Sequence, residues 1–450
     1  MSEFWELTMR FFSLVDANVR YVLAGSVILG AGSGAIGSFA FLQRKSLVGD
    51  SLAHAALPGV CVAFMLTSSK APLTLFLGAA ATGWLGALAM NWIVRVSRLK
   101  LDAALGLVLS IFFGVGVALL TVIQNTGAGN QSGLDKFIFG QAASIVFDDV
   151  ITIAIVASLM IGALALLFKE FKLLTFDESF SFSLGRPTRA LQFALTTLLV
   201  LAVTVGLQVV GVVLMAAMLI MPAAAARQWT NSLARMVFLA AAFGSISGVV
   251  GAYISFLAPQ LPTGPWIVVT AGGIFVVSLL FAPERGLVAQ RLRRESAERR
   301  IIRDHLLKAF FRLGSAGVES TTMFALRTVA DEARLAPAVA STGLRRLKLN
   351  NLAAESDPGW ALTGPGRIVA SRVVRLHRLW EVYLSRYLEL PADHVHRDAD
   401  ELEHLITPEM ERRLEALLER PERDPHDRPI PYAAENSVEQ TKRGAERKTP

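Results

Sequence analysis

The sequence has little cysteine and lacks a phosphate-binding loop. Cys61 is the single cysteine among 450 residues, so no disulfide can form within the chain. No segment matches G-x-x-x-x-G-K-[ST], the pattern whose backbone amides cradle nucleotide phosphates. We therefore expect this chain to have no catalytic residues and to bind no nucleotide. The N-terminus also lacks a basic region followed by an apolar core and a cleavage site, and we expect residues 1–20 to form an interfacial amphipathic segment instead of a signal peptide.

Charged residues are scarce over residues 20–283, where long apolar runs dominate. The whole chain is 53% hydrophobic and has a mean hydropathy of +0.48, which is typical of membrane proteins. Runs of spanning or near-spanning length lie at about 21–42, 52–69, 73–95, 102–124, 148–168, 189–208, 210–227, 233–257 and 264–283. The fold class predicted for residues 21–285 is therefore an all-α polytopic membrane domain with about nine transmembrane helices. A merged or re-entrant segment would change that count.

Basic residues occur in alternate loops between these runs. The loops with "QRKS", "RVSRLK" and "KEFK" are basic, whereas "TSSKAP" and "NTGAGNQSGLDKF" hold one lysine each. Because cytoplasmic loops carry an excess of lysine and arginine, the basic loops should face the cytoplasm. The chain would then cross the cytoplasmic (inner) membrane several times, with its N-terminus outside and residues 285–450 inside.

The remainder of the chain is charged and reads as a separate, mainly α-helical soluble part. Residues 286–300 form a basic linker, for which a role in fixing membrane orientation is the simplest interpretation. Residues 301–370 have the pattern of a winged helix-turn-helix, with the wing in "ESDPGWALTGPGR". Residues 371–432 predict a helical domain, and residues 433–450 a disordered tail.

The stretch "GDSLAHAALPG" places Asp50 and His54 at the start of an apolar run. His54 is the only histidine before residue 305. The two side chains are four residues apart and so share one helical face, and carboxylate and imidazole are ligands for first-row divalent metals. An ionisable residue within a membrane segment is functional by default. The alternative is that Asp50 caps a helix beginning at Ser51 and that His54 bonds a neighbouring backbone group.

Four motifs over residues 20–285 together resemble the permease family of ABC-type manganese, zinc and iron importers. They are "GDSLAHAALPGVCVAFML", "LDAALGLVLSIFFGVGVAL", "FDESFSFSLGRP" and "VVGVVLMAAMLIMPAAAA". The resemblance implies a second permease copy or paralogue, cytoplasmic ATPase subunits that hydrolyse ATP, and an extracytoplasmic metal-binding protein that delivers metal near residues 125–137. Asp50 and His54 would line the transport path. The loop with Asp177, Glu178 and Gly185 would dock on the ATPase, although it is also compatible with an ordinary amphipathic loop.

The other six histidines lie in the soluble part, several of them beside acidic residues. Asp400, Glu403 and His404 share one helical face, and His377 and Glu381 form another pair four residues apart. Such spacing could build a pocket of nitrogen and oxygen ligands for a metal. A solvated face of ion pairs would show the same pattern.

Residues 301–431 resemble the metal-dependent repressors of the diphtheria-toxin-repressor and manganese-repressor family, through "VVRLHRLWEVYLSRYLELPADHVHRDADELEHLI" and "RDPHDRPIP". The resemblance implies metal binding and dimerisation over 371–432. It assigns one metal site to Asp304, Asp400, Glu403 and His404, and a second to His377, Glu381 and His396. Leu307 stands where manganese-type members carry a second acid, which argues against their two-ion cluster. Asp400 replaces the cysteine of other members, and its hard oxygen favours Mn²⁺ or Fe²⁺ over Zn²⁺.

The predicted recognition helix carries Arg345, Arg346 and Lys348, which suit phosphate contacts with DNA. Basic residues on a helix are more often simply solvated. We therefore expect a membrane permease of a divalent-metal ABC importer, for manganese first and for zinc or iron second, fused to a cytosolic metal-sensing domain. The alternatives are a membrane-tethered, metal-dependent DNA-binding regulator and a permease with a purely structural dimerising tail.

Overall fold

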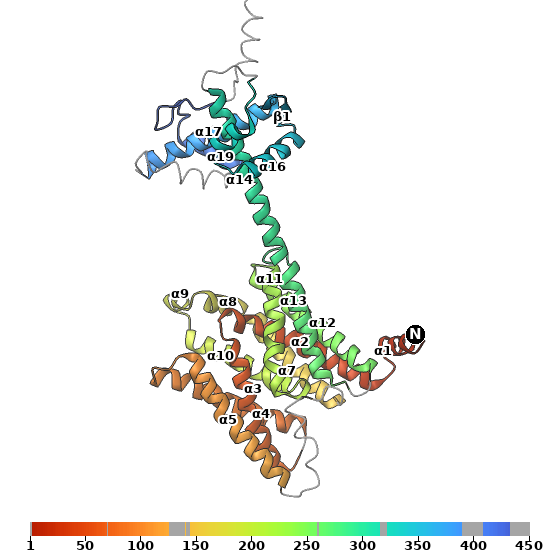
Figure 1. Cartoon of the computed structure of the whole chain (residues 1–450). Helices are drawn as coiled ribbons and strands as arrows, with labels where there is room; N and C mark the ends of the chain where they lie inside the picture. Colours follow the sequence, from red (N-terminus) through yellow and green to blue (C-terminus); the bar gives the residue numbers. More distant parts are fainter. Residues whose placement is uncertain are drawn as a thin grey trace, which may run out of the picture. The chain divides into compact units, whose positions relative to one another are not determined.

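The structure is a computed structural model that describes residues 2–69, 71–125, 140, 145–258, 261–315, 322–388 and 408–432. Contacts divide the chain into two compact units, Met1–Gln290 and Arg291–Pro450. Figure 1 labels most elements of both units. We call them the membrane unit and the second unit.

Helices are the only regular secondary structure in the described part of the membrane unit. They are α1 Ser2–Ser13, α2 Ala17–Leu42, α3 Ser46–Thr67, α4 Pro72–Val96, α5 Leu101–Asn125, α7 Phe147–Leu166, α8 Phe168–Phe176, α9 Glu178–Ser183, α10 Thr188–Val209, α11 Val212–Trp229, α12 Leu233–Leu257 and α13 Thr263–Phe281. Among the described residues, nine of the helices are long and apolar enough to cross a membrane. The predicted polytopic α-helical fold is confirmed.

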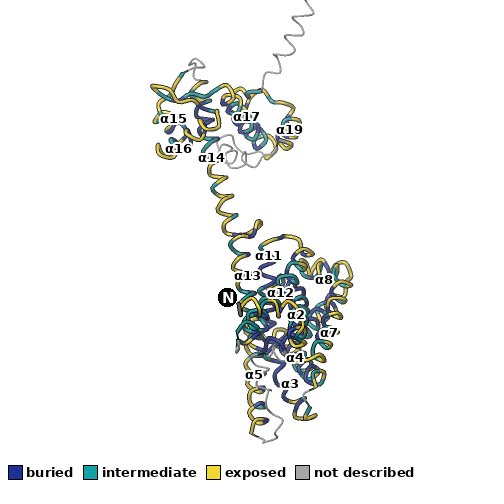
Figure 2. The backbone as a smooth tube through the Cα atoms, turned by 90° about the vertical axis from the view of Figure 1, so that its right-hand side faces the viewer, coloured by how far each residue is buried: buried dark blue, intermediate teal, exposed yellow. Residues whose placement is uncertain are grey.

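Helices α2 and α3 lie inside this bundle, whereas α5 exposes much of its surface (Figure 2). Small residues let the backbones approach closely: a Cβ on Gly30 of α2 would lie 2.3 Å from the carbonyl oxygen of Gly244 on α12. The chain between α10 and α11 breaks at Val210 and Gly211, where Gly211 has a φ of +91°. Val210 is buried in the core, as expected for non-helical backbone at membrane depth.

The second unit begins within a long helix and continues as a winged helix-turn-helix. Its elements are α14 Leu287–Ser315, α15 Leu326–Glu332, α16 Pro337–Leu349, β1 Ala353–Ser356, β2 Gly359–Leu362, α17 Gly364–Tyr387 and α19 Pro408–Leu417. Strands β1 and β2 pair antiparallel and form the predicted wing. The basic stretch 287–300 is helical and runs without interruption into the helix that carries Asp304.

Two apolar clusters organise this unit. Leu306, Phe310 and Leu344 belong to a cluster that joins α14 to the helix-turn-helix and the wing. Leu379 and Leu414 belong to a second cluster, which joins α17 to α19. The predicted fold of a winged helix followed by a helical domain is confirmed.

Candidate metal sites

Asp50 and His54 lie together on α3, one turn apart. The helix begins at Ser46, so Asp50 lies in its second turn and the alternative role as an N-cap at Ser51 is wrong. The Oδ1 atom of Asp50 is 3.5 Å from Nε2 of His54. The side chains are 32% and 13% exposed, respectively, so the pair remains partly accessible. This geometry brings one oxygen and one nitrogen ligand to a single point on the helix.

The other ring nitrogen of His54 has no partner. Within the described residues, Nδ1 is buried and makes no hydrogen bond, which contradicts the alternative that His54 bonds a neighbouring backbone group. The imidazole stands edge-on to the ring of Phe113 on α5, with 4.7 Å between ring centroids. Because a buried polar atom without a partner is costly, this nitrogen is a feature that needs a function.

Pro58 leaves the backbone carbonyl oxygen of His54 as a third candidate metal ligand at this position. Proline has no N–H, so it cannot donate the helical hydrogen bond to the carbonyl oxygen of His54, four residues earlier. The next amide, that of Gly59, donates to Thr82 Oγ1 of α4 at 3.1 Å. The helix is therefore locally altered directly after His54, and a backbone oxygen there is relieved of its usual helical partner.

Polar contacts fix α3 against α5 on both sides of His54. Ser51 Oγ donates to the carbonyl oxygen of Leu105 at 3.1 Å, and Cys61 Sγ lies 3.7 Å from the carbonyl oxygen of Gly116. Both side chains are buried. The position of His54 along α5 is therefore set by contacts one turn before it and two turns after it.

The loop with Asp177, Glu178 and Gly185 forms the short helix α9 and its ends. Asp177 caps α9 by accepting the amide of Phe180 at 2.8 Å, and Gly185 ends this segment with a φ of +72°. Phe180 and Phe182 are exposed, Phe182 at 73%, although sequence reasoning pointed to the acids. Exposed aromatic side chains are typical of surfaces that bind a protein partner.

This loop also meets the turn that precedes α3. Gln43 Nε2 lies 3.4 Å from Thr175 Oγ1 at the end of α8. Burial lowers the pKa of Lys45, and the nearby carboxylate of Glu178 acts in the opposite direction. Lys45 directly precedes α3, so the loop contacts the start of the helix that carries Asp50 and His54.

In the second unit, His377 and Glu381 form a tight pair on α17. Nε2 of His377 is 3.0 Å from Oε1 of Glu381, and the side chains are only 7% and 1% exposed. On the other side of the ring, Lys308 Nζ of α14 lies 3.3 Å from Nδ1. If Nδ1 accepts from Lys308, Nε2 carries the proton and donates to Glu381. A metal at Nε2 would require the other tautomer, so Lys308 opposes metal binding in this arrangement.

The remaining predicted ligands of the second unit are not gathered with this pair in the described chain. Asp304 is buried and accepts from Arg303 of the same helix at 2.7 Å. Leu307 packs in the apolar core. His396, Asp400, Glu403 and His404 lie outside the described residues, and within the described ranges no group of three His, Cys, Asp or Glu side chains could hold a metal. Of the predicted ligands that the structure describes, His377 and Glu381 are the pair that brings a nitrogen and an oxygen together.

The basic residues of α16 have different surroundings. Lys348 is held by Glu355 of β1 at 2.7 Å and lies over the ring of Trp360. Arg345 is exposed, and Arg346 borders a cavity between α16 and α14. Lys348 therefore secures the wing, whereas Arg345 and Arg346 are both exposed.

The membrane unit matches a known transport family. The family model described as ABC 3 transport family matches residues 16–282. The chain belongs to the ABC 3 transport family. The manganese transport system membrane protein MntC of Bacillus subtilis is 41% identical over 426 residues, which cover 94% of this chain and 96% of that protein. The zinc transport system membrane protein TroC of Treponema pallidum is 48% identical over 287 residues, which cover 64% of this chain and 95% of that protein.

Structural similarity and a second family model complete the assignment. PsaBC from Streptococcus pneumoniae, solved in complex with Fab, matches with a TM-score of 0.57 and 30% identity, over 64% of this chain and 99% of that one. The model described as iron dependent repressor, metal binding and dimerisation domain matches residues 363–432. Both predicted resemblances are confirmed. The chain is a multi-pass membrane permease of the ABC class, fused to a domain of the metal-dependent repressor type.

Proposed function

We propose that this chain is the permease of an ATP-driven importer of a divalent first-row metal, and that Asp50 and His54 bind the metal in transit. The observation that carries this proposal is the pair formed by Oδ1 of Asp50 and Nε2 of His54, which lie 3.5 Å apart and remain partly accessible on one face of α3. A metal is the substrate here, so it must be released as well as bound. A site with few ligands that is partly open suits rapid exchange of the ion.

Manganese is the favoured substrate, with zinc and iron next. A relative that matches over 94% of this chain, including the second unit, is named as a manganese transporter. A relative that covers 64% of this chain is named as a zinc transporter. The pair of one carboxylate and one imidazole accommodates either ion, so the ligands alone favour neither.

Energy and metal delivery come from separate subunits. The chain lacks a P-loop, so a cytoplasmic ATPase would bind at α8 and α9, with Asp177 shaping the loop, Glu178 beside Lys45, and Phe182 presenting an apolar contact. A second permease copy or paralogue and an extracytoplasmic metal-binding protein would complete the importer. The alternation of basic loops puts α8 and α9 and the second unit in the cytoplasm, and the N-terminus outside.

The second unit would sense cytosolic metal. Asp304 would belong to one metal site with Asp400, Glu403 and His404, and His377 and Glu381 would belong to a second site with His396. His396, Asp400, Glu403 and His404 lie outside the described residues. Mn²⁺ or Fe²⁺ is favoured over Zn²⁺ in this unit. When bound, the metal would supply a positive charge that joins α17 to its neighbours. DNA binding is the second candidate function, because α15, α16 and the wing form a winged helix with Arg345 exposed. A metal-dependent and salt-sensitive affinity for duplex DNA would support it.

The test is metal uptake in cells that express this chain with its ATPase and binding protein. His54→Ala should reduce Mn²⁺ uptake at least about tenfold, because it removes the only nitrogen ligand of the pair. Cys61→Ala is the matched control, since it alters a buried residue of the same helix that also contacts α5. Normal uptake by a well-expressed His54→Ala chain would exclude this site.

A further inference from the structure

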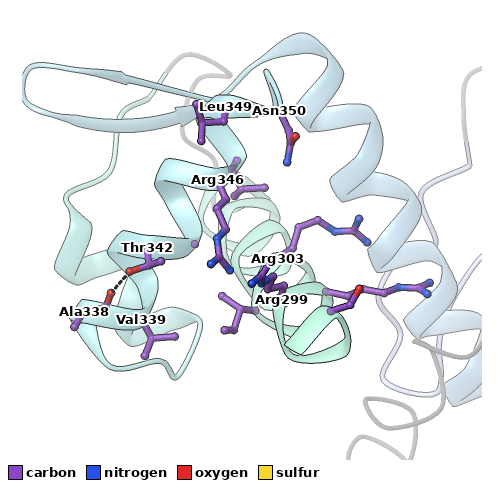
Figure 3. Close-up of a pocket in the computed structure, with 13 residues that line it drawn as sticks. Arg299, Arg303, Ala338, Val339, Thr342, Arg346, Leu349 and Asn350 are labelled. Carbon is purple, nitrogen blue, oxygen red and sulfur yellow. Dashed lines mark hydrogen bonds between the residues drawn. The ribbon is translucent and has the colours of Figure 1, made fainter. Parts of the chain in front are cut away.

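A basic cavity lies in the second unit, away from the candidate metal ligands on α17. It has a volume of about 880 Å³ and is bordered by α14 and α16. Four arginines line it: Arg299, Arg300 and Arg303 from α14, and Arg346 from α16. In Figure 3, Arg346 reaches from α16 into the space that Arg299 of α14 also borders. The volume is in the range typical of small-molecule sites, which span about 300–1,000 Å³.

The charge of this cavity is only partly balanced. Arg303 pairs with Asp304 at 2.7 Å, and Arg299 pairs with Glu295 at 3.3 Å. Arg300 approaches Asp304 only at 4.0 Å. Among the described residues, Arg346 makes no ion pair within that distance. Four guanidinium groups thus face two carboxylates, and the surplus of positive charge attracts an anion.

The rest of the lining narrows the class of anion. Thr342 and Asn350 add polar groups to the lining, and Ile302, Val339 and Leu347 add apolar ones. Guanidinium groups bind phosphate oxygens in pairs, and here they come from two helices and face one space. We propose that this cavity binds a small soluble anion with two or more phosphate groups, and that the bound anion holds α16 to α14. A concave site of this kind suits a compact ligand better than the convex surface that a helix presents to a DNA groove.

The test is calorimetric binding of inorganic pyrophosphate to the purified full-length chain in detergent, at near-physiological salt. Arg346→Gln should weaken binding at least about tenfold, because it removes the charge-assisted contact made by an exposed side chain. Arg345→Gln is the matched control: it removes the same charge from the neighbouring residue, which does not line the cavity, and should change the affinity less than about twofold. Val339→Trp keeps the charge but fills the cavity, and should also weaken binding several-fold.

Each other outcome would overturn the proposal. Absence of pyrophosphate binding would do so, and so would equal losses in Arg345→Gln and Arg346→Gln, because both would show a diffuse basic surface. Two further binding experiments use phosphatidic acid vesicles and a DNA duplex as probes. If Arg346→Gln weakens binding to either one while pyrophosphate does not bind, the cavity serves a lipid surface or a nucleic acid and not a small soluble anion.

Discussion

The two units of this chain each hold an acid and a histidine one helical turn apart, in very different surroundings. Asp50 and His54 are 3.5 Å apart on α3, partly exposed, and one imidazole nitrogen has no partner. His377 and Glu381 are 3.0 Å apart on α17 and almost fully buried, and Lys308 approaches the second nitrogen. The same residue types at the same spacing therefore form a loose pair in one unit and a tight pair in the other.

This difference suits the two proposed tasks. A transport site must take up and release its ion, so its ligands should have few competing partners and little to rearrange. In the tight pair, Nε2 of His377 and Oε1 of Glu381 are already in contact, and a metal can bind between them only if it replaces that contact. The loose pair should therefore matter to transport and little to stability, whereas the tight pair should matter strongly to stability.

The largest expected effect is on transport. Asp50→Ala should lower Mn²⁺ uptake at least about tenfold, because it removes the carboxylate ligand of the path. The same change should alter the unfolding free energy by less than about 0.5 kcal/mol, since the carboxylate is partly exposed and its ion pair is long. Uptake assays and thermal unfolding of the purified chain check both halves. A large loss of stability would mean that this pair is structural.

The opposite pattern is expected for Glu381→Ala. Removing the carboxylate leaves the buried Nε2–H of His377 without its acceptor, which costs about 1–3 kcal/mol. Limited proteolysis of the full chain should show faster cleavage in the second unit while the membrane unit stays protected. Glu409→Ala is the control, since its ion pair with Arg413 is exposed. Equal proteolysis of both variants would remove the contrast between the two pairs.

A smaller effect is expected at the proposed ATPase surface. Phe182→Ser should reduce co-purification of the ATPase several-fold, because an exposed aromatic side chain contributes apolar contact area. Glu178→Lys should also weaken recruitment, through its position beside Lys45. Asp177 is less useful for this test because its loss would uncap α9. Wild-type recruitment by Phe182→Ser would place the docking surface elsewhere.

The apolar runs and the turn chemistry made most of the fold predictable. Segments of about twenty apolar residues have one stable conformation in lipid, and the wing follows from turn residues between short strands. The start of α3 was harder to predict: the apolar run begins near residue 52, but the helix begins at Ser46, and Val48 and Gly49 of its first turn are buried. Helix continuity there depends on tertiary burial, which a hydropathy window does not detect.

The residue types of the candidate sites could be predicted from the sequence, but the side chains that surround them could not. The spacing of Asp50 and His54 indicated a shared face, yet Phe113 is distant in sequence and nothing in its own segment marks it as the neighbour of His54. Lys308 lies in the apolar stretch "LLKAFF", where its approach to His377 depends on how α14 packs on α17. The arginine cavity likewise joins two helices that are far apart in the sequence.

Lys308→Gln should sharpen the contrast by making the tight pair a better metal site. The substitution removes a positive charge 3.3 Å from Nδ1 of His377, and an amide oxygen can accept a proton from that nitrogen and so leave Nε2 free to bind metal. Mn²⁺ affinity of the purified chain should rise a few-fold. Lys348→Gln, which removes a charge bound to Glu355 on the wing, is the control. Weaker metal binding in Lys308→Gln would mean that the lysine supports the site.

The smallest expected effect concerns the acid stability of the second unit, through the carboxylate that joins α19 to α17. Burial raises the pKa of Glu411, but hydrogen bonds from Arg372 and Arg375, at 2.5 and 2.6 Å, outweigh it and hold the pKa below its ordinary value of 4.5. A lowered folded-state pKa stabilises the fold above the ordinary value, and this contribution is lost as the pH falls through the folded-state pKa. The proteolytic resistance of α19 should therefore decline in acid below about pH 4.5.

Glu411→Gln should be less stable at neutral pH and should lack this part of the decline. Glu409→Gln, which alters the exposed face of the same helix, should keep it. An unchanged acid profile in Glu411→Gln would show that other carboxylates control the attachment of α19, and the tight packing around α17 would then depend on its apolar cluster instead of its ion pairs.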